Sequence, residues 1–103
     1  MRSMKFDDLF TGFIRLHVLH HAAEREIYGL WMIEELASHG YKLSPGTLYP
    51  MLHAMEKKGY LKSRPERNGR SVRKLYRATK LGRQGLALAK ARIRAFTGEA
   101  MKS

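Results

Sequence analysis

The sequence of 103 residues contains no cysteine, so it can form neither a disulfide bond nor a thiolate metal site. It also has no run approaching the roughly 20 apolar residues that a helix needs to cross a bilayer. The N-terminal segment carries Asp7 and Asp8 within an amphipathic pattern, which is not typical of a signal peptide. These absences predict a soluble chain, and the lack of cysteine is consistent with a cytoplasmic location.

Acidic residues are also scarce, because 9 Asp and Glu stand against 20 Lys and Arg and leave a formal net charge of +11. A surface this basic favours nucleic acid as a partner first and an anionic membrane second. Residues 1–40 contain six acidic and four basic side chains. The positive excess therefore lies almost wholly in the later part of the chain.

Motifs of catalysis are missing. We find no Ser-His-Asp order, paired carboxylates, phosphate-binding glycine loop or metal triad, and therefore expect neither an enzyme nor a cofactor. His17 and His21 stand four residues apart and His20 lies beside them, so they could share a metal ion. No carboxylate or third imidazole stands at a convincing spacing to complete such a site. We interpret the three histidines as polar residues at a helix end and predict no metal.

The N-terminal segment from Lys5 to about His21 predicts a first helix with apolar residues on more than one stripe. Such a helix in a chain this small needs partners on two sides, and a domain of this length benefits from burying more surface by oligomerising. We therefore expect it to contact both its own domain and a second subunit. The apolar residues are Phe6, Leu9, Phe10, Phe13, Ile14, Leu16 and Val18.

A second helix is expected over Tyr28–His39, after a short connection at Ala22–Ile27 and before Gly40. Its predicted buried face consists of Leu30, Ile33, Leu36 and Ala37. Trp31 falls at the edge of this face. It could be a core or subunit-boundary aromatic, or a wall of a small-molecule pocket.

The segment from Ser44 to Leu61 carries the clearest local signals. Ser44 before Pro45 predicts a helix start, and Gly59 predicts its end. Pro50 lies inside this helix at a cost of roughly 3 kcal/mol, unless the helix begins late with Thr47 as its cap. Leu48, Leu52 and Met55 recur at helical spacing and should face the core. The opposite face consists of Gly46, Thr47, Tyr49, Pro50, His53 and Lys57.

A hairpin should follow, with strands at Tyr60–Arg67 and Ser71–Ala78 around Asn68-Gly69, a pair favoured in type I′ turns. In the second strand, Val72, Lys74 and Tyr76 alternate with Arg73, Leu75 and Arg77, as expected of a half-buried strand. The hairpin is strongly basic and contains a single acidic residue, Glu66, which predicts phosphate contact. Its basic residues are Lys62, Arg64, Arg67, Arg70, Arg73, Lys74 and Arg77.

Thr79 should cap a last helix that runs to about Met101. One face of this helix has the three-four spacing of a helix-pairing seam, formed by Leu86, Ala89, Ile93, Phe96 and Ala100. Three helices followed by a hairpin make a winged helix-turn-helix domain, which already has a core, so we expect the seam to meet a partner chain. The alternative is packing on the first helix of the same chain.

Three blocks of sequence together resemble the PadR family of transcriptional regulators. The first block resembles the family's recognition helix. It consists of Ser-Pro-Gly-Thr-Leu-Tyr-Pro-Met-Leu at residues 44–52 and Glu-Lys-Lys-Gly-Tyr-Leu at residues 56–61. The others are Tyr28-Gly29 and Lys-Leu-Tyr-Arg-Ala-Thr-Lys-Leu-Gly at residues 74–82. Leu75 and Ala78 depart from the larger side chains usual there, and Tyr28-Gly29 reverses the common order.

The resemblance implies a regulator of the short C-terminal form, which dimerises through its first and last helices and reads DNA with its winged domain. It also implies control by a small molecule bound between subunits. We therefore predict a mainly α fold with a small β-hairpin, divided into a winged helix-turn-helix domain at residues 1–78 and a dimerisation helix at 79–103. The alternative is a winged-helix module that docks on a protein or an anionic membrane surface.

The predicted partners are double-stranded DNA, a second copy of the chain and an effector, with no membrane. The candidate DNA-binding residues are Ser44, Gly46, Thr47, Tyr49, His53, Lys57, Arg64, Arg67, Arg70, Arg73 and Lys74. The candidate dimer interface is Phe6, Leu9, Phe10, Phe13, Leu86, Ala89, Ile93 and Phe96. The candidate effector pocket is Phe10, Phe13 and Trp31.

Overall fold

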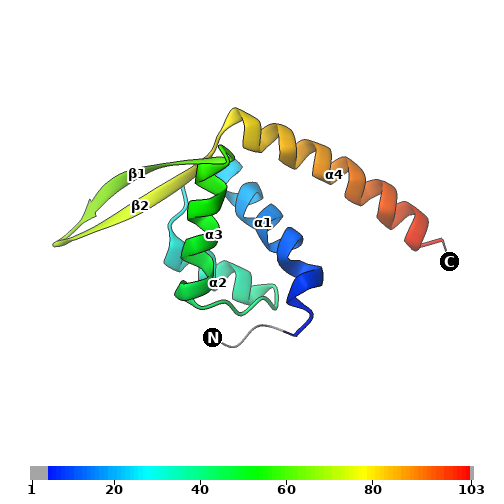
Figure 1. The fold of residues 1–103 in the computed structure, drawn as a ribbon, viewed down its shortest axis with the longest axis horizontal. Coiled ribbons are helices and arrows are strands. Elements are labelled where there is room, and N and C mark those ends of the chain that lie inside the picture. The colour runs from blue at the N-terminus through cyan, green and yellow to red at the C-terminus, as the bar shows by residue number, and fades with distance from the viewer. Residues whose placement is uncertain (1–4, 103) are drawn as a thin grey trace.

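The computed structural model describes residues 5–102, which form four helices and one antiparallel hairpin. In chain order the elements are α1 (Asp7–Glu24), α2 (Gly29–Ser38), α3 (Pro45–Lys57), β1 (Leu61–Asn68), β2 (Ser71–Ala78) and α4 (Lys80–Ala100). Helices α1–α3 form the body, while the hairpin and α4 extend from it in opposite directions, so the molecule measures 55 × 33 × 21 Å (Figure 1). This architecture confirms the predicted fold class. Within residues 5–102, no helix is long and apolar enough to span a membrane.

The hydrophobic core lies where the three helices of the body meet the base of the hairpin and the start of α4. Full burial of one aliphatic or aromatic side chain stabilises the fold by roughly 1.5–3 kcal/mol. The predicted inward face of α3 belongs wholly to this core, so its opposite face has a fixed direction. The buried members are Ile14, Val18, Leu19, Ala22, Ile27, Met32, Leu36, Leu48, Leu52, Met55, Leu61, Tyr76, Ala78 and Leu86.

The first helix is longer than predicted, and the expected connection at Ala22–Ile27 is wrong. α1 continues to Glu24 because Ala22 is buried in the core and alanine is the strongest helix former. The chain then crosses to the hairpin, where the Ile27 N–H donates to the Tyr76 carbonyl at 2.9 Å and the Tyr76 N–H donates to the Ile27 carbonyl at 2.7 Å. This pair of bonds ties the hairpin to the helical body.

The second helix lies over the predicted region, but its buried face is rotated. Leu30 is 58% exposed and Ala37 is also exposed, whereas Met32 and Leu36 are buried. The first residue of the helix, Gly29, is buried because the ring of Tyr49 lies directly against it. That close approach accompanies the rotation of α2. The sequence of α2 alone could not predict it, because Tyr49 belongs to α3.

The third helix begins at Pro45 and includes Pro50, so the alternative of a late start is wrong. The Ser44 carbonyl accepts hydrogen bonds from the N–H groups of Thr47 and Leu48, both at 3.0 Å. Gly59 ends the helix in the left-handed region at φ +88°, as its position predicted.

The turn of the hairpin is displaced by one residue from the prediction. Strand pairing runs from Leu61 opposite Ala78, both buried, to Asn68 opposite Ser71, which leaves Gly69 and Arg70 as the two-residue loop. Gly69 has a φ of +65°, and among residues 5–102 Phe6 is the only non-glycine residue with positive φ. A glycine with positive φ at the first loop position is typical of a type II′ turn, so the predicted type I′ turn is wrong.

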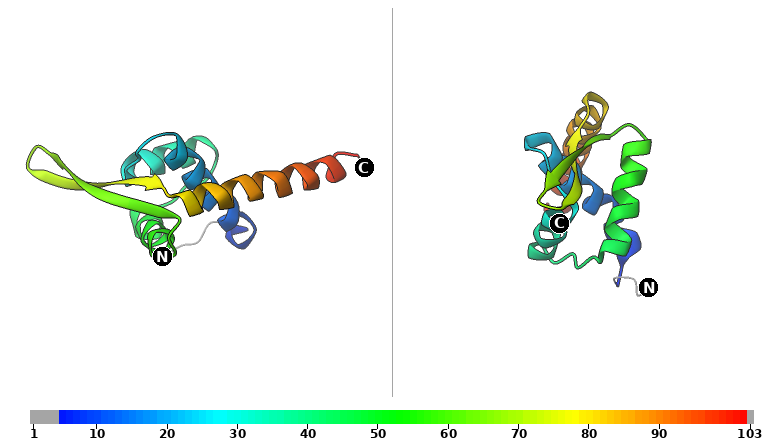
Figure 2. Two further views of the ribbon diagram at one scale, coloured as in Figure 1. Left: turned by 90° about the horizontal axis from the view of Figure 1, so that it is seen from above. Right: turned by 90° about the vertical axis from the view of Figure 1, so that its left-hand side faces the viewer.

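The inner and outer halves of the hairpin differ in burial. Leu75 and Tyr76 are both buried although successive residues of a strand point to opposite faces, because α1, α3 and α4 all contact the base of the strands. Val72, farther out, is exposed. The outer half projects from the body as a narrow wing (Figure 2). The simple alternation predicted for β2 therefore fails at its base.

The last helix begins as predicted, with Thr79 Oγ1 accepting a hydrogen bond from the Gly82 N–H at 3.0 Å. Its first half packs on α1 of the same chain, so that Leu86, a predicted dimer contact, is only 7% exposed. The second half extends beyond the body, where Phe96 is 66% exposed (Figures 1 and 2). The seam thus divides into a part used within the chain and a part that the chain leaves uncovered.

Two glycines of α4 provide a test of this packing. A Cβ at Gly82 would lie 2.2 Å from the Tyr60 carbonyl oxygen, whereas nothing lies within 4 Å of a Cβ at Gly85. Gly82→Ala should lower the free energy of unfolding by more than about 2 kcal/mol, because backbone must shift. Gly85→Ala should raise it by about 0.5–1 kcal/mol through helix propensity. Urea unfolding followed by circular dichroism measures both, and equal effects would contradict the packing of α4 on Tyr60.

Candidate nucleic-acid interface

The outward face of α3 is small and uncharged at its start and basic at its end. Gly46, Tyr49, Pro50, His53 and Lys57 are exposed. Thr47 is half-buried, and its hydroxyl lies 3.4 Å from the hydroxyl of the exposed Ser44. The structure therefore places every predicted α3 site residue on one side of the helix or at its start. That side faces away from the core.

The ring of Tyr49 joins the start of α2 to the middle of α3. A Cβ on Gly29 would lie 2.3 Å from Cε1 of this ring, so only glycine allows the observed approach. Tyr49 nevertheless remains 39% exposed. The ring thus packs between two helices with one side and presents the other to solvent.

A hollow of about 590 Å³ lies between α3, the start of α2 and the outer part of β2. The helix and the wing therefore share one concave surface, which is the kind of surface that can enclose an extended polymer. The residues that line it are Tyr28, Gly29, Leu30, Tyr49, His53, Asn68, Ser71, Val72, Arg73, Lys74 and Tyr76.

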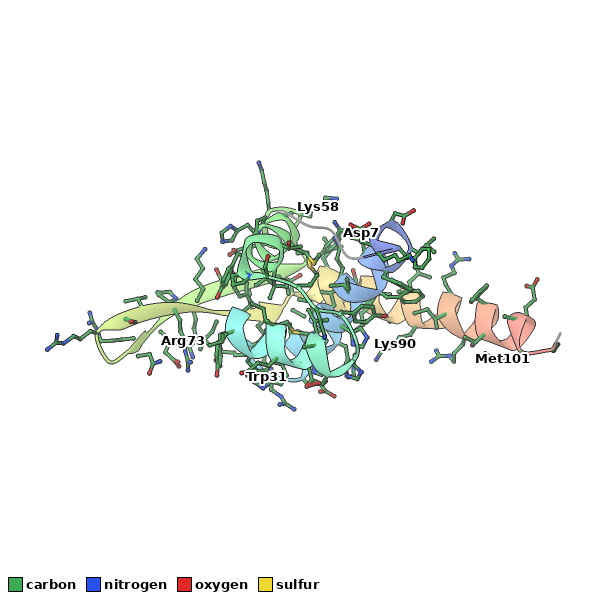
Figure 3. The ribbon with its side chains drawn as sticks, turned by 90° about the horizontal axis from the view of Figure 1, so that it is seen from below. Asp7, Trp31, Lys58, Arg73, Lys90 and Met101 are labelled. Carbon is green, nitrogen blue, oxygen red and sulfur yellow. The ribbon has the colours of Figure 1, made fainter. Side chains whose placement is uncertain are left out.

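Three predicted site residues on the wing form ion pairs with carboxylates of the same chain. Arg64 donates to both carboxylate oxygens of Glu26, at 2.6 and 2.7 Å. Arg73 donates twice to Glu66, at 3.1 and 2.9 Å, and its guanidinium lies 4.0 Å from the centre of the Tyr28 ring. Figure 3 shows Arg73 on the side of the wing that faces α2. In addition, Lys74 Nζ lies 3.8 Å from Glu56 Oε1.

These contacts change the electrostatics that the sequence predicted, since only Glu66 lies within the hairpin itself. The hydrogen bonds from Arg64 hold the pKa of the Glu26 carboxyl below its usual value, and that carboxylate raises the pKa of Arg64. Glu66 likewise raises the pKa of Arg73. Glu26 lies 38 residues before Arg64, so no local pattern could reveal the pair.

Arg67 and Arg70 are exposed near the tip of the wing. Within residues 5–102, the ion pairs of the wing involve Arg64, Arg73 and Lys74 but neither of these two. Lys62 and Arg77, opposite each other at the base of the wing, are also exposed and outside these ion pairs, so uncompensated positive charge lies both at the tip and at the base.

The predicted dimer residues lie along α1 and α4. Phe6, Leu9, Phe13 and Phe96 are exposed, whereas Phe10, Ala89 and Ile93 are half-buried. Figure 3 shows α4 reaching out to Met101, far from the body. A shallow groove of about 200 Å³ runs between the two helices and is lined by Phe13, Leu16, His17, His20, Leu86, Lys90 and Ile93.

The three aromatic residues predicted for an effector pocket occupy different surroundings. Phe13 lines the groove between α1 and α4. Phe10 packs against Tyr41, with ring centres 5.9 Å apart. Trp31 lies on α2 (Figure 3), and its ring is nearly perpendicular to that of His21, with ring centres 5.3 Å apart. The structure supports an aromatic groove at Phe13 but not a pocket shared by all three.

The histidines of α1 have a neighbour that the sequence analysis missed. Glu24 lies one turn after His20, and its Oε2 atom is 3.8 Å from His20 Nε2. Ligand atoms of His20, His21 and Glu24 all lie within 4.8 Å of one another. The expectation that no carboxylate stands at a suitable spacing is therefore wrong, because α1 extends beyond its predicted end and carries Glu24 one turn after His20.

The order of elements, with a helix presented beside a basic hairpin, defines the class of winged helix-turn-helix transcriptional regulators. Residues 18–88 match the Transcriptional regulator PadR-like family, and the chain belongs to this family. The predicted resemblance is thereby confirmed. Members of the family are transcriptional regulators, not enzymes, and DNA binding is what membership implies.

Individual relatives agree with this assignment. The chain is similar to the transcriptional regulator Rv3488 of Mycobacterium tuberculosis, with 51% identity over 73 residues, 71% of this chain and 68% of that protein. It is also similar to the crystal structure of a PadR family transcriptional regulator from Eggerthella lenta, with a TM-score of 0.75 at 28% identity over 97% of this chain and 96% of that one. A PadR-like transcription factor from Bacteroides fragilis shares the fold, with a TM-score of 0.81 at 18% identity over 93% of this chain and 94% of that one.

The contact between Gly29 and Tyr49 can be tested by a double-mutant cycle. Gly29→Ala should lower the free energy of unfolding by about 1–3 kcal/mol, because the new methyl group displaces the ring. In a Tyr49→Ala background the same change should cost less than about 0.5 kcal/mol, since the clash is gone. Urea unfolding of the four proteins gives the coupling energy. Gly12→Ala, which meets nothing within 4 Å, is the control, and strictly additive effects would contradict the contact.

Proposed function

We propose that this regulator binds palindromic operator DNA as a homodimer and represses transcription there. The observation that carries the proposal is the concave surface shared by the outward face of α3 and the outer part of β2. A recognition helix in the major groove and a basic hairpin on the adjacent backbone need this arrangement. The formal net charge of +11 supplies the attraction to phosphate.

In this proposal α3 enters the major groove with its N-terminal part. Ser44, Thr47 and His53 are the candidates for contacts with bases or phosphates, because their polar groups lie at the start and on the outward face of the helix. Gly46 allows close approach of the backbone, and Lys57 meets a phosphate at the far end. Tyr49 contacts the sugar-phosphate backbone with the side of its ring that Gly29 does not cover. The strongly packed inward face keeps these groups aligned.

The wing residues divide into two roles. Arg67 and Arg70 contact DNA directly, with Arg70 in the loop placed to enter the minor groove, where negative potential attracts a guanidinium. Arg73 and Lys74 line the concave surface and Arg64 lies on the paired strand β1, but carboxylate partners restrain all three. Their main contribution is to hold the wing at its angle to the body, and their DNA contacts are secondary.

The homodimer forms through the apolar faces of α1 and α4. Phe6, Leu9, Phe13 and Phe96 are exposed in a single chain, and large exposed apolar side chains that follow two adjacent helices indicate a protein interface. A two-fold axis through this interface places the α3 helix of each subunit opposite one half-site of the palindromic operator. Their expected separation is about 34 Å, one turn of B-DNA.

Repression follows if the bound dimer covers a promoter, and an effector would relieve it by changing the angle between the two winged domains. The groove between α1 and α4 is the proposed effector site, because Phe13, Leu86 and Ile93 give it an apolar lining and it lies where the subunits meet in the proposed dimer. An apolar, aromatic-containing molecule fits this lining best.

The two roles of the wing predict different salt dependence. Fluorescence anisotropy with a labelled operator, selected from random duplexes, should give a steep fall of log affinity with log salt. Arg67→Ala and Arg70→Ala should each reduce the magnitude of the slope by about 1, because each loses one phosphate contact. Arg64→Ala should change the slope by less, since Glu26 already neutralises this side chain. A slope near zero for the native protein would refute the proposal.

The proposed dimer predicts a defined effect of Phe96→Ser. At micromolar concentration, analytical ultracentrifugation should show a dimer for the native chain and a shift of at least tenfold in the dissociation constant for the variant, because an aromatic anchor contributes more than about 1.4 kcal/mol. Val72→Ser removes an equally exposed apolar residue from the wing and serves as the control. A monomeric native chain, or equal effects of the two substitutions, would contradict the interface.

A further inference from the structure

We propose that His20, His21 and Glu24 bind a divalent transition-metal ion, and that its occupancy adjusts the position of the wing. The part of this proposal that concerns the wing depends on the proposed function, whereas ion binding does not. The three residues lie in the last two turns of α1, and none of them lines the hollow between α3 and the wing. They constitute a site apart from the DNA interface, at the end of the groove between α1 and α4 that His20 also lines.

The spacing of the ligand atoms fits an ion after small side-chain adjustments. His20 Nε2 and Glu24 Oε2 are 3.8 Å apart, and candidate ligand atoms of all three residues lie within 4.8 Å of one another. Ligand atoms at about 2.0–2.1 Å from a tetrahedral zinc ion are separated by roughly 3.3 Å. The side chains of His20 and Glu24 are 43% and 51% exposed, so an ion can enter from solvent and these two can close on it.

A second carboxylate, that of Glu35, lies beside one ring nitrogen of His21, an arrangement common for histidines that bind metals. Nε2 of His21 lies 3.4 Å from Glu35 Oε2, on α2. Within the part of the chain that the structure describes, Nδ1 of the same ring is buried and has no hydrogen-bond partner. A carboxylate that accepts the proton of one ring nitrogen leaves the lone pair of the other for a metal. An ion would therefore supply the partner that Nδ1 lacks.

The donor atoms define the class of ion. Two imidazoles and one carboxylate favour borderline divalent ions such as Zn²⁺, Co²⁺ or Ni²⁺, and the absence of cysteine removes the thiolate ligands that select softer ions. Three protein ligands leave at least one coordination position for water. The site thus suits a reversibly bound ion better than a closed structural one.

The ion site is joined to the wing by three residues of chain. Glu24 is the last residue of α1, Glu26 holds Arg64 of β1 through two hydrogen bonds, and Ile27 pairs with Tyr76 of β2. Drawing Glu24 toward the histidines shifts the start of this short connection. Because the connection has few residues that could absorb this shift, the shift is transmitted to both strands of the hairpin.

The test uses the full-length protein, freed of metal by a chelator, and Zn²⁺ as the probe. Isothermal titration calorimetry should show one ion bound per chain. His20→Ala and Glu24→Gln should each weaken binding at least tenfold. Glu34→Gln, the same change at an exposed position of α2, should leave it unaltered. Co²⁺ should also quench the fluorescence of Trp31, whose ring is 5.3 Å from that of His21, and lose this effect in Glu24→Gln.

The outcomes separate ion binding from DNA binding. Absence of saturable binding, or equal affinity in native protein and Glu24→Gln, would overturn the ion site. If Zn²⁺ binds, the affinity for the selected operator should change at least threefold in native protein and remain constant in Glu24→Gln. No change in native protein would overturn the link to the wing. A chain that binds Zn²⁺ but no duplex at all would instead overturn the proposed function and leave the ion site standing.

Discussion

The two backbone hydrogen bonds between Ile27 and Tyr76 are the constraint on which the arrangement of this molecule depends. Both residues are almost completely buried, so the bonds form away from competing water, and leaving either unmade would cost about 1–3 kcal/mol. They fasten a two-stranded ribbon, which would be marginally stable alone, to the helical body. Because α3 packs on the same core, these bonds also fix the angle between α3 and the ribbon, and with it the shape of the concave surface that the two share.

Three carboxylates hold basic side chains of the wing. The carboxylate of Glu26, next to Ile27, holds Arg64, while Glu56 on α3 and Glu66 on β1 hold Lys74 and Arg73. Each exposed ion pair adds little stability by itself. Together they neutralise the middle of the ribbon and leave positive charge at its tip, on Arg67 and Arg70, and at its base, on Lys62 and Arg77.

The sequence predicted those features that depend on local chemistry. Ser44-Pro45, Gly59 and Thr79 marked helix ends correctly, because caps and positive φ are properties of a few adjacent residues. The face of α3 was also correct. The rotation of α2 and the ion pair between Glu26 and Arg64 were missed, since both depend on residues distant in sequence. The turn was misplaced by one residue because Asn68-Gly69 is a strong local signal, while pairing at the base of the strands decided the register.

The outer half of α4 has a consequence for how the chain behaves on dilution. Ile93 is half-buried and lines the groove with α1, but every residue of the helix beyond it is exposed, and so short a stretch does not remain helical in water by itself. In the proposed homodimer, a second copy covers this end of the helix. If that dimer forms, helix content at this end is coupled to protein concentration, and in a cell that makes little of the protein the last turns melt and are open to proteases. Scarcity would then shorten the lifetime of the protein.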